Sequence, residues 1–252
     1  MQKQYLLGFG AAVAVIFFVS AVITFNPSGV PDEDRICQVS TLENLIEGNY
    51  NGTVSYGAIM NMGDTGLGTF DHLDGEMVAA GGEYFQIKSD GSVTLVDSKE
   101  TSPFAEVTRF NPDSVFEIRD SMNFSEIKNL MQENLTLNNR ICTIRIDGKY
   151  SEVKARSVAR QEMPYVPLSE ALSMSENIFE AKEITGTATG FWHPDYMSGL
   201  NAQGFHLHFI DEKREFGGHI IDFTFETGFI SLDYSDEFLL IMPEENKIYN
   251  NN

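Results

Sequence analysis

Apolar and polar residues alternate along the chain from residue 67 to residue 97, in short runs separated by a glycine pair and an Asp-Gly dipeptide. Because successive side chains of a strand point to opposite faces of a sheet, this period of two predicts strands. The predicted strands are Leu67–Leu73, Gly75–Ala80, Glu83–Lys88 and Ser92–Asp97. Gly81-Gly82 and Asp90-Gly91 favour tight turns between them, so this segment predicts an antiparallel meander.

Strand patterns return along the rest of the chain. Phe104–Phe110 follows Pro103, which has no backbone N–H to donate, and therefore predicts a strand at a sheet edge. Arg140–Ile146 and Tyr150–Val158 flank the dipeptide Asp147-Gly148 and predict a hairpin. The C-terminal part adds four predicted strands joined by short turns: Glu183–Trp192, Gly204–Ile210, Gly217–Phe225 and Phe229–Tyr234.

Three segments carry helical patterns instead. Thr41–Gly48 begins with a capping residue and ends at a glycine, and Ser169–Glu180 predicts a second short helix. In Asn123–Asn134 the apolar residues recur every three to four positions, which is the spacing of one helix face. Together these elements predict an α+β fold, rich in β structure, with mixed sheets and a few short helices.

The N-terminal run from Leu6 to Phe25 has no charged residue and is long enough to cross a bilayer as a helix. Lys3 precedes it and the acidic stretch Asp32–Asp34 follows it, so the positive-inside rule places the remainder outside the cytoplasm. An uncleaved anchor and a cleaved signal peptide both fit this run, whereas a buried core helix does not explain its position and flanks. We expect an extracytoplasmic protein, either membrane-anchored or secreted.

The chain is expected to have three parts. Residues 1–30 form the anchor or signal peptide with the start of a linker, in which proline, glycine and acidic residues cannot build a core. Residues 31–150 form an N-terminal β-rich half. Residues 151–252 form a C-terminal β half, which contains the metal-binding pattern described below.

Composition narrows the class of partner. The sequence has 37 acidic and 17 basic residues and a formal net charge of −20. A surface that follows a phosphate backbone needs clustered lysine and arginine, so nucleic acid is excluded as a partner. The two cysteines, Cys37 and Cys142, permit one disulfide outside the cytoplasm but do not establish it.

Three of the five histidines, His206, His208 and His219, lie close together in the sequence. Strand alternation places His206 and His208 on one face, with apolar residues on the other, core-facing side. If Lys213-Arg214 forms the tip of a hairpin, His208 lies opposite His219, with β-carbons about 5 Å apart. The three imidazoles can then converge on one metal ion at a β-hairpin.

Without a metal, three imidazoles on one hairpin would each need hydrogen-bond partners and would repel one another if protonated, so a purely structural role is the costlier alternative. Imidazole ligands suit zinc, iron, copper and nickel, and zinc (Zn2+) is the expected ion. Three protein ligands leave a position open for water or substrate, as in catalytic zinc sites. The sequence contains no phosphate-binding loop, dinucleotide fingerprint or nucleophile elbow.

Three segments, in order along the chain, resemble the alpha-acetolactate decarboxylase family: GTFDHLDGEM at Gly68–Met77, VKARSVARQ at Val153–Gln161, and GFHLHFIDEKREFGGH at Gly204–His219. The resemblance covers roughly Leu42–Pro243, and the histidine segment is its most specific part. It implies decarboxylation of 2-acetolactate, a 2-hydroxy-3-oxo acid, to acetoin and carbon dioxide. It also implies that His206, His208 and His219 bind a zinc ion, which stabilises the enediolate.

The resemblance extends to residues outside this cluster. It implies an active-site glutamate at Glu76, an active-site arginine at Arg156 and a pocket threonine at Thr69. Arg156 is expected to hold the substrate carboxylate through a bidentate fork, and Glu76 to supply the proton that completes the reaction. Composition alone would place Glu76 and Arg156 on the solvated surface. The resemblance further implies a homodimer, and it leaves His72 and His193 with structural roles.

Two other functions remain open. The family carries a second active-site glutamate in a longer C-terminal tail, and Glu244 and Glu245 follow the final strand too early to match it. This departure favours a surface-anchored protein of the same fold that binds metal without catalysis. A zinc hydrolase is the other alternative; it would use metal-bound hydroxide to cleave esters or amides and would release no carbon dioxide from acetolactate.

Overall fold

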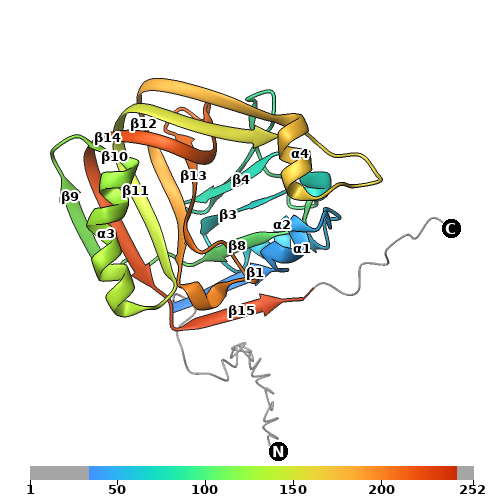
Figure 1. Ribbon diagram of the computed structural model, residues 1–252, viewed down its shortest axis with the longest axis horizontal. Coiled ribbons are helices and arrows are strands. Elements are labelled where there is room, and N and C mark those ends of the chain that lie inside the picture. The colour runs from blue at the N-terminus through green and yellow to red at the C-terminus, as the bar shows by residue number, and fades with distance from the viewer. Residues whose placement is uncertain (1–33, 243–252) are drawn as a thin grey trace, which may run out of the picture.

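Two large β-sheets make up most of residues 34–242, the part of the chain that the computed structural model describes (Figure 1). The first sheet has seven strands, and only its β1–β15 pair is parallel, so the sheet is mixed. In spatial order its strands are β15 (Glu237–Ile241), β1 (Arg35–Val39), β8 (Ala105–Thr108), β3 (Thr65–Thr69), β4 (Glu76–Ala80), β5 (Glu83–Ile87) and β6 (Val93–Leu95). The consecutive strands β3 to β6 confirm the predicted meander.

Four strands of the second sheet close into a ring, because β11 and β13 each pair with both β12 and β14. Two short strands extend this sheet, each pairing with β14. The ring strands are β11 (Cys142–Val158), β12 (Glu176–His193), β13 (Gly204–Asp211) and β14 (Gly217–Tyr234), and the extensions are β9 (Ser114–Ile118) and β10 (Met122–Asn123). The interior of the ring is an apolar core of isoleucine, phenylalanine and tyrosine side chains.

Short helices cover the two sheets, as predicted. They are α1 (Leu42–Ile46), α2 (Tyr56–Met60), α3 (Phe124–Asn138) and α4 (Leu168–Ser175), accompanied by a small pairing of β2 (Val54–Ser55) with β7 (Thr101–Ser102) and by 3-10 turns at Asp71–Leu73 and Asp195–Met197. The side chain of Thr41 caps α1, and Asn123 forms a capping box at the start of α3. Figure 1 shows α3 beside β10 and β14, and the apolar face of the helix joins the core of the ring.

The predicted hairpin at Asp147-Gly148 is wrong, because β11 continues through this dipeptide as one strand. Gly148 lies opposite Gly186 in β12 and Gly228 in β14. A β-carbon on Gly148 would lie 2.2 Å from the carbonyl oxygen of Thr227. The glycine therefore permits close packing of three strands in the ring and makes no turn.

Several predicted boundaries and the predicted position of one strand also differ from the structure. Gly217–Phe225 and Phe229–Tyr234 belong to one strand, β14, in which the intervening Gly228 faces Gly148. Helix α4 ends at Ser175, before the predicted end, since β12 begins at the next residue. β8 lies inside its sheet, between β1 and β3, and is not an edge strand. Pro103 precedes β8, so its missing N–H does not interrupt the pairing.

Some predictions fall outside these observations. The apolar run at Leu6–Phe25 and the acids Glu244 and Glu245 lie outside the described residues. Between residues 34 and 242, none of the helices combines the length and apolarity that crossing a bilayer requires.

The division of the chain into two halves at residue 150 stays a prediction. Strand β11 runs through this position, and β15, from the C-terminal half, completes the sheet of the N-terminal half. Cys37 and Cys142 are buried thiols in different sheets.

Asp233, near the end of β14, is a buried carboxyl. Its Oδ2 accepts a hydrogen bond from the backbone N–H of Asn111 at 3.0 Å. Burial raises the pKa of Asp233 to about 7, and neighbouring carboxylates such as Asp113 add to the effect, while the hydrogen bond from Asn111 opposes it. The folded protein therefore favours the neutral form of this side chain.

Replacing Asp233 with Asn should make the protein more stable at neutral and alkaline pH. In the unfolded chain the carboxyl ionises near 3.8, so the wild type loses stability as the pH rises from there through about 7. The loss amounts to at most about 4 kcal/mol. Asparagine keeps an acceptor for Asn111 and cannot ionise. Urea unfolding at pH 5 and pH 8 should show a larger advantage of the variant at pH 8; parallel profiles would contradict the assignment.

Candidate active site

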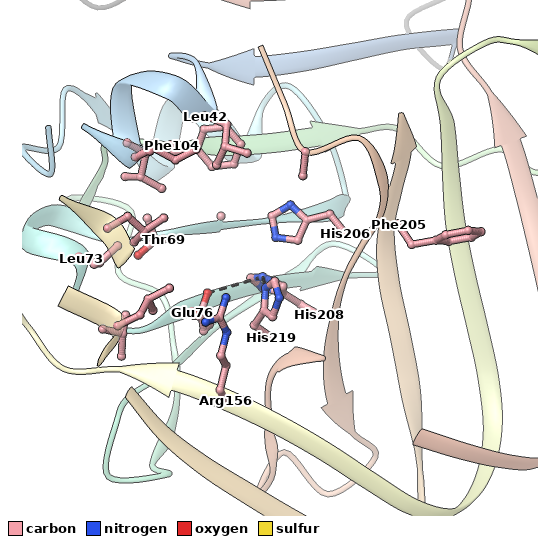
Figure 2. Close-up of a pocket in the computed structure, with 17 residues that line it drawn as sticks. Leu42, Thr69, Leu73, Glu76, Phe104, Arg156, Phe205, His206, His208 and His219 are labelled. Atoms are coloured by element: carbon pink, nitrogen blue, oxygen red, sulfur yellow. Dashed lines mark hydrogen bonds and ion pairs between the residues drawn. The ribbon is translucent and has the colours of Figure 1, made fainter. Parts of the chain in front are cut away.

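A pocket of about 300 Å³ lies where β3 and β4 of the first sheet meet the ring (Figure 2). One end is polar, and the other is lined by apolar side chains that include leucines of α1 and α4. All six residues that were predicted to form a site line this pocket: Thr69, Glu76, Arg156, His206, His208 and His219. They come from five strands, β3 and β4 of the first sheet and β11, β13 and β14 of the ring, which the packing of the two sheets brings together.

The histidines have the predicted register. His208 in β13 pairs directly with His219 in β14, and His206 lies two residues before His208 on the same face. One nitrogen from each of the three rings lies within 4.8 Å of the others. The opposite face of β13 carries Leu207 and Phe209, which are buried in the core of the ring. The hairpin therefore presents three imidazoles to the pocket and apolar side chains to the core.

Hydrogen bonding fixes the orientation of His208. Its Nδ1 lies 2.8 Å from the carbonyl oxygen of Met77, and because a carbonyl can only accept, Nδ1 carries the proton and donates. Nε2 of His208 is then an acceptor, 3.3 Å from Nδ1 of His219. Two nitrogens that bind one tetrahedral zinc ion are about 3.3 Å apart, given Zn–N distances of about 2.0–2.1 Å. This spacing fits a metal ion.

The three imidazoles are neutral at physiological pH. Burial lowers the pKa of His208 to about 4, although its bond to Met77 opposes the change. Burial, followed by the proximity of the other histidines, lowers the pKa of His206 and His219 well below the usual range. Metal ligands must be deprotonated to bind, so the pocket keeps these side chains in the form that a metal requires.

Glu76 and Arg156 lie beside the histidines (Figure 2). Oε2 of Glu76 is 3.5 Å from Nε2 of His208. Burial raises the pKa of Glu76 to about 7, while Arg156 lowers it and Glu176 raises it further. Nη1 of Arg156 donates to Oε2 of Glu176 at 3.0 Å. The site thus combines a carboxyl that exchanges protons near neutral pH with a cation held in place by a second acid.

Thr69 supports the strand that carries Glu76. It pairs with Glu76 across β3 and β4, and its hydroxyl donates to the carbonyl oxygen of Gly75 at 2.7 Å. Gly75 has φ +91, and a β-carbon there would lie 2.3 Å from the carbonyl oxygen of Ile87. The DGEM sequence is therefore a tight turn that delivers Glu76 to the pocket.

Sequence reasoning missed two features of the site. Glu176 is the partner of Arg156, and its position at the start of β12 could not be predicted while that segment was assigned to a helix. The apolar wall was also missed, although the leucine spacing in both helical segments is a signal for it. Its residues from the two helices are Leu42, Leu45, Ile46, Leu168 and Leu172.

Comparisons with known proteins agree with this geometry. A family model described as alpha-acetolactate decarboxylase matches residues 36–252. The alpha-acetolactate decarboxylase of Methanosarcina mazei is 43% identical over 226 residues, which cover 88% of this chain and 78% of the relative. The protein of the same name from Bacillus licheniformis is 39% identical over 210 residues, 83% of each chain.

Solved structures share the fold. The alpha-acetolactate decarboxylase of Bacillus subtilis strain 168 aligns with a TM-score of 0.82 at 37% identity, over 86% of this chain and 93% of that one. A Staphylococcus aureus protein of unknown function, described as similar to alpha-acetolactate decarboxylase, has the same TM-score at 22% identity and supports the fold alone. Both alignments cover most of the residues that form the two sheets here.

Proposed function

Because the chain belongs to the alpha-acetolactate decarboxylase family, we propose that its pocket converts 2-acetolactate to acetoin and carbon dioxide with a zinc ion. The activity is that of a carboxy-lyase. The observation that carries the proposal is the group of three neutral imidazoles, whose nitrogens lie within 4.8 Å of one another, in one pocket with Glu76 and Arg156.

His206, His208 and His219 would hold the metal, and three ligands leave room for a bidentate substrate. Zinc suits an all-imidazole site, and the chemistry needs no change of oxidation state. When bound, such an ion would act as a Lewis acid and would stabilise the negative charge that develops on the substrate as carbon dioxide leaves. The protein's remaining task is to orient the substrate and to move one proton.

Arg156 orients the carboxylate that departs. Its Nη1 is occupied by Glu176, so its other N–H groups remain to donate to the substrate. Glu76 then supplies a proton to the carbon that has lost carbon dioxide, which gives acetoin. A carboxyl with a pKa of about 7 is protonated in a large fraction of molecules at neutral pH and can therefore donate. The apolar wall of the pocket limits the access of water.

Replacing Arg156 with Lys should lower kcat/KM about 10–100-fold, chiefly through a higher KM. Lysine keeps the charge but loses the planar fork that grips both a carboxylate and Glu176. The loss of one charge-assisted hydrogen bond, about 1.5–3 kcal/mol, corresponds to this range. Steady-state acetoin formation measures it, with Lys154→Arg on the same strand as the control. Wild-type kinetics for the Arg156 variant would remove this residue from substrate binding.

The function is tested by incubating the purified protein with racemic 2-acetolactate, with zinc and after chelation, and measuring acetoin and carbon dioxide. Metal-dependent release of both products supports the proposal. Bound zinc without turnover would favour the metal-binding alternative, and cleavage of an ester substrate without carbon dioxide release would favour the hydrolase. The three-histidine site alone is compatible with each of these functions, and the family decides between them.

The proposal includes a homodimer and attachment to a membrane through residues 6–25, with the pocket outside the cytoplasm. Support for a dimer comes from Val115 in β9 and Phe229 in β14, neighbouring strands on the outside of the ring, whose side chains are 55% and 50% exposed. Light scattering on the purified protein tests the dimer, and fractionation of cells tests the location. A monomer at micromolar concentration would contradict the first part.

A further inference from the structure

A buried polar network joins the two sheets close to the histidine cluster. Glu106 in β8 and His193 at the end of β12 form a contact of 2.8 Å between Oε1 and Nε2, and both side chains are fully buried. The other carboxylate oxygen of Glu106 accepts from Nδ2 of Asn201 at 2.7 Å, and the same amide lies 2.7 Å from Oε1 of Gln38. The mechanism proposed above uses none of these four side chains.

The network fixes the loop that leads into β13. Nε2 of Gln38 donates to the carbonyl oxygen of Leu200 at 2.9 Å. Oδ1 of Asn201 accepts from the backbone N–H of Ala202 at 2.8 Å. Ala202 lines the pocket, and β13 begins two residues later, at Gly204. One side of the active-site pocket is therefore anchored to β1 and β8 of the opposite sheet.

Strand register places the network beside His206. Phe191 pairs with His206 and His193 pairs with Gly204, so His193 is the diagonal neighbour of His206 on the same face of the sheet. The rings of Phe191 and His193 are 5.9 Å apart. His206 and His193 are thus close neighbours on one face of the sheet.

His206 needs such support more than His208 does. The ring of His208 is held by its bond to the carbonyl oxygen of Met77. The buried Nδ1 of His206 has no hydrogen-bond partner within the described part of the chain. Its position therefore depends on the backbone of β13 and on the side chains packed around it. A metal site loses affinity when the groups that orient its ligands are removed.

We propose that Glu106, His193 and Asn201 are positioning residues for His206, which fix the entry of β13 and so set the affinity of the site for its metal. The proposal rests on the proposed metal centre. Burying a carboxylate and an imidazole together is costly, and replacing such a pair with apolar side chains is often neutral or stabilising. Stability alone therefore gives no reason for this network, whereas orientation of a ligand does.

The test replaces Glu106 with Gln, which keeps the shape but removes the charge and one acceptor, and measures zinc affinity of the full chain by competition with a chelator. We expect affinity to fall about 10–100-fold, with turnover largely restored at saturating zinc. Thr108→Val is the control. Thr108 lies two residues further along β8, equally buried, and its hydroxyl donates to the carbonyl oxygen of Arg35 at 2.9 Å, so its loss should reduce stability and leave zinc affinity unchanged.

Asn201→Ala provides a second reading, because it cuts the link to Ala202 and leaves the Glu106–His193 contact in place. It should also weaken zinc binding, and it tests the positioning role if the Glu106→Gln variant does not fold. Tight binding by the wild type, with wild-type affinity in both variants, overturns the positioning role alone. A wild type that binds no zinc overturns the metal centre and this inference with it.

Discussion

Replacing His208 with Ala is expected to abolish stable metal binding and to lower kcat/KM by about 10³-fold or more, equivalent to about 4 kcal/mol of transition-state stabilisation. His208 is the most buried of the three histidines and pairs with His219 across the hairpin. Alanine leaves two imidazoles, which is too few to hold zinc with the affinity of a three-ligand site. Metal content of the purified variant and acetoin formation with added zinc measure the two effects.

His72→Asn is the matched control for His208→Ala. His72 lies in the 3-10 turn before β4 with φ +61, a conformation that asparagine tolerates, and it is not part of the histidine cluster. The control variant should retain its metal. If His208→Ala kept both zinc and turnover, the three-histidine centre would be wrong, and the activity would need another origin.

Replacing Glu76 with Gln should lower kcat about 10²–10⁴-fold while zinc remains bound, because glutamine has the same shape and cannot deliver a proton. Glu76 is 9% exposed, so solvent is a poor substitute donor at this position. Single-turnover experiments should show that carbon dioxide is released and that acetoin formation lags behind it. The measurement separates proton delivery from binding, since KM depends mainly on Arg156 and the metal ligands.

Glu83→Gln is the control for the Glu76 variant. Glu83 lies on the adjacent strand β5, is exposed, and forms an ion pair with Arg214 at 3.2 Å outside the pocket. The same chemical change there should leave kcat unchanged. Equal turnover in the Glu76 variant and the wild type would assign Glu76 a structural role and leave the proton to come from water.

The histidine centre could be predicted from the sequence because its geometry is local. Strand alternation fixed the faces of His206 and His208, and the length of the turn fixed the opposition of His208 and His219, which the pairing confirms. Glu76 and Arg156 differ, because their place depends on how the ring packs against the first sheet. Only the family resemblance pointed to them.

The wrong predictions also concern contacts between segments that are far apart in the sequence. Asp147-Gly148 has the sequence of a hairpin turn, but Gly148 meets Gly186 and Gly228 of neighbouring strands, a contact set by pairing over long distances in the chain. Glycine permits both a turn and a close approach, so a local pattern could not distinguish the two. The buried contact of Glu106 with His193 could not be predicted for a similar reason. The residues around each of them in the sequence do not indicate which buried acid contacts which histidine.

The ring closes through a short seam. Three residue pairs join β13 to β14, and one of them is His208 with His219. A few pairs are a weak closure, so thermal fluctuations should open the ring here before the longer pairings of β11 give way. A ligand that bridges the seam stabilises the closed form by about 2.7 kcal/mol when its concentration is 100 times its dissociation constant. A metal ion bound by the histidines would thus also hold the ring closed, and its removal would lower the stability of the fold.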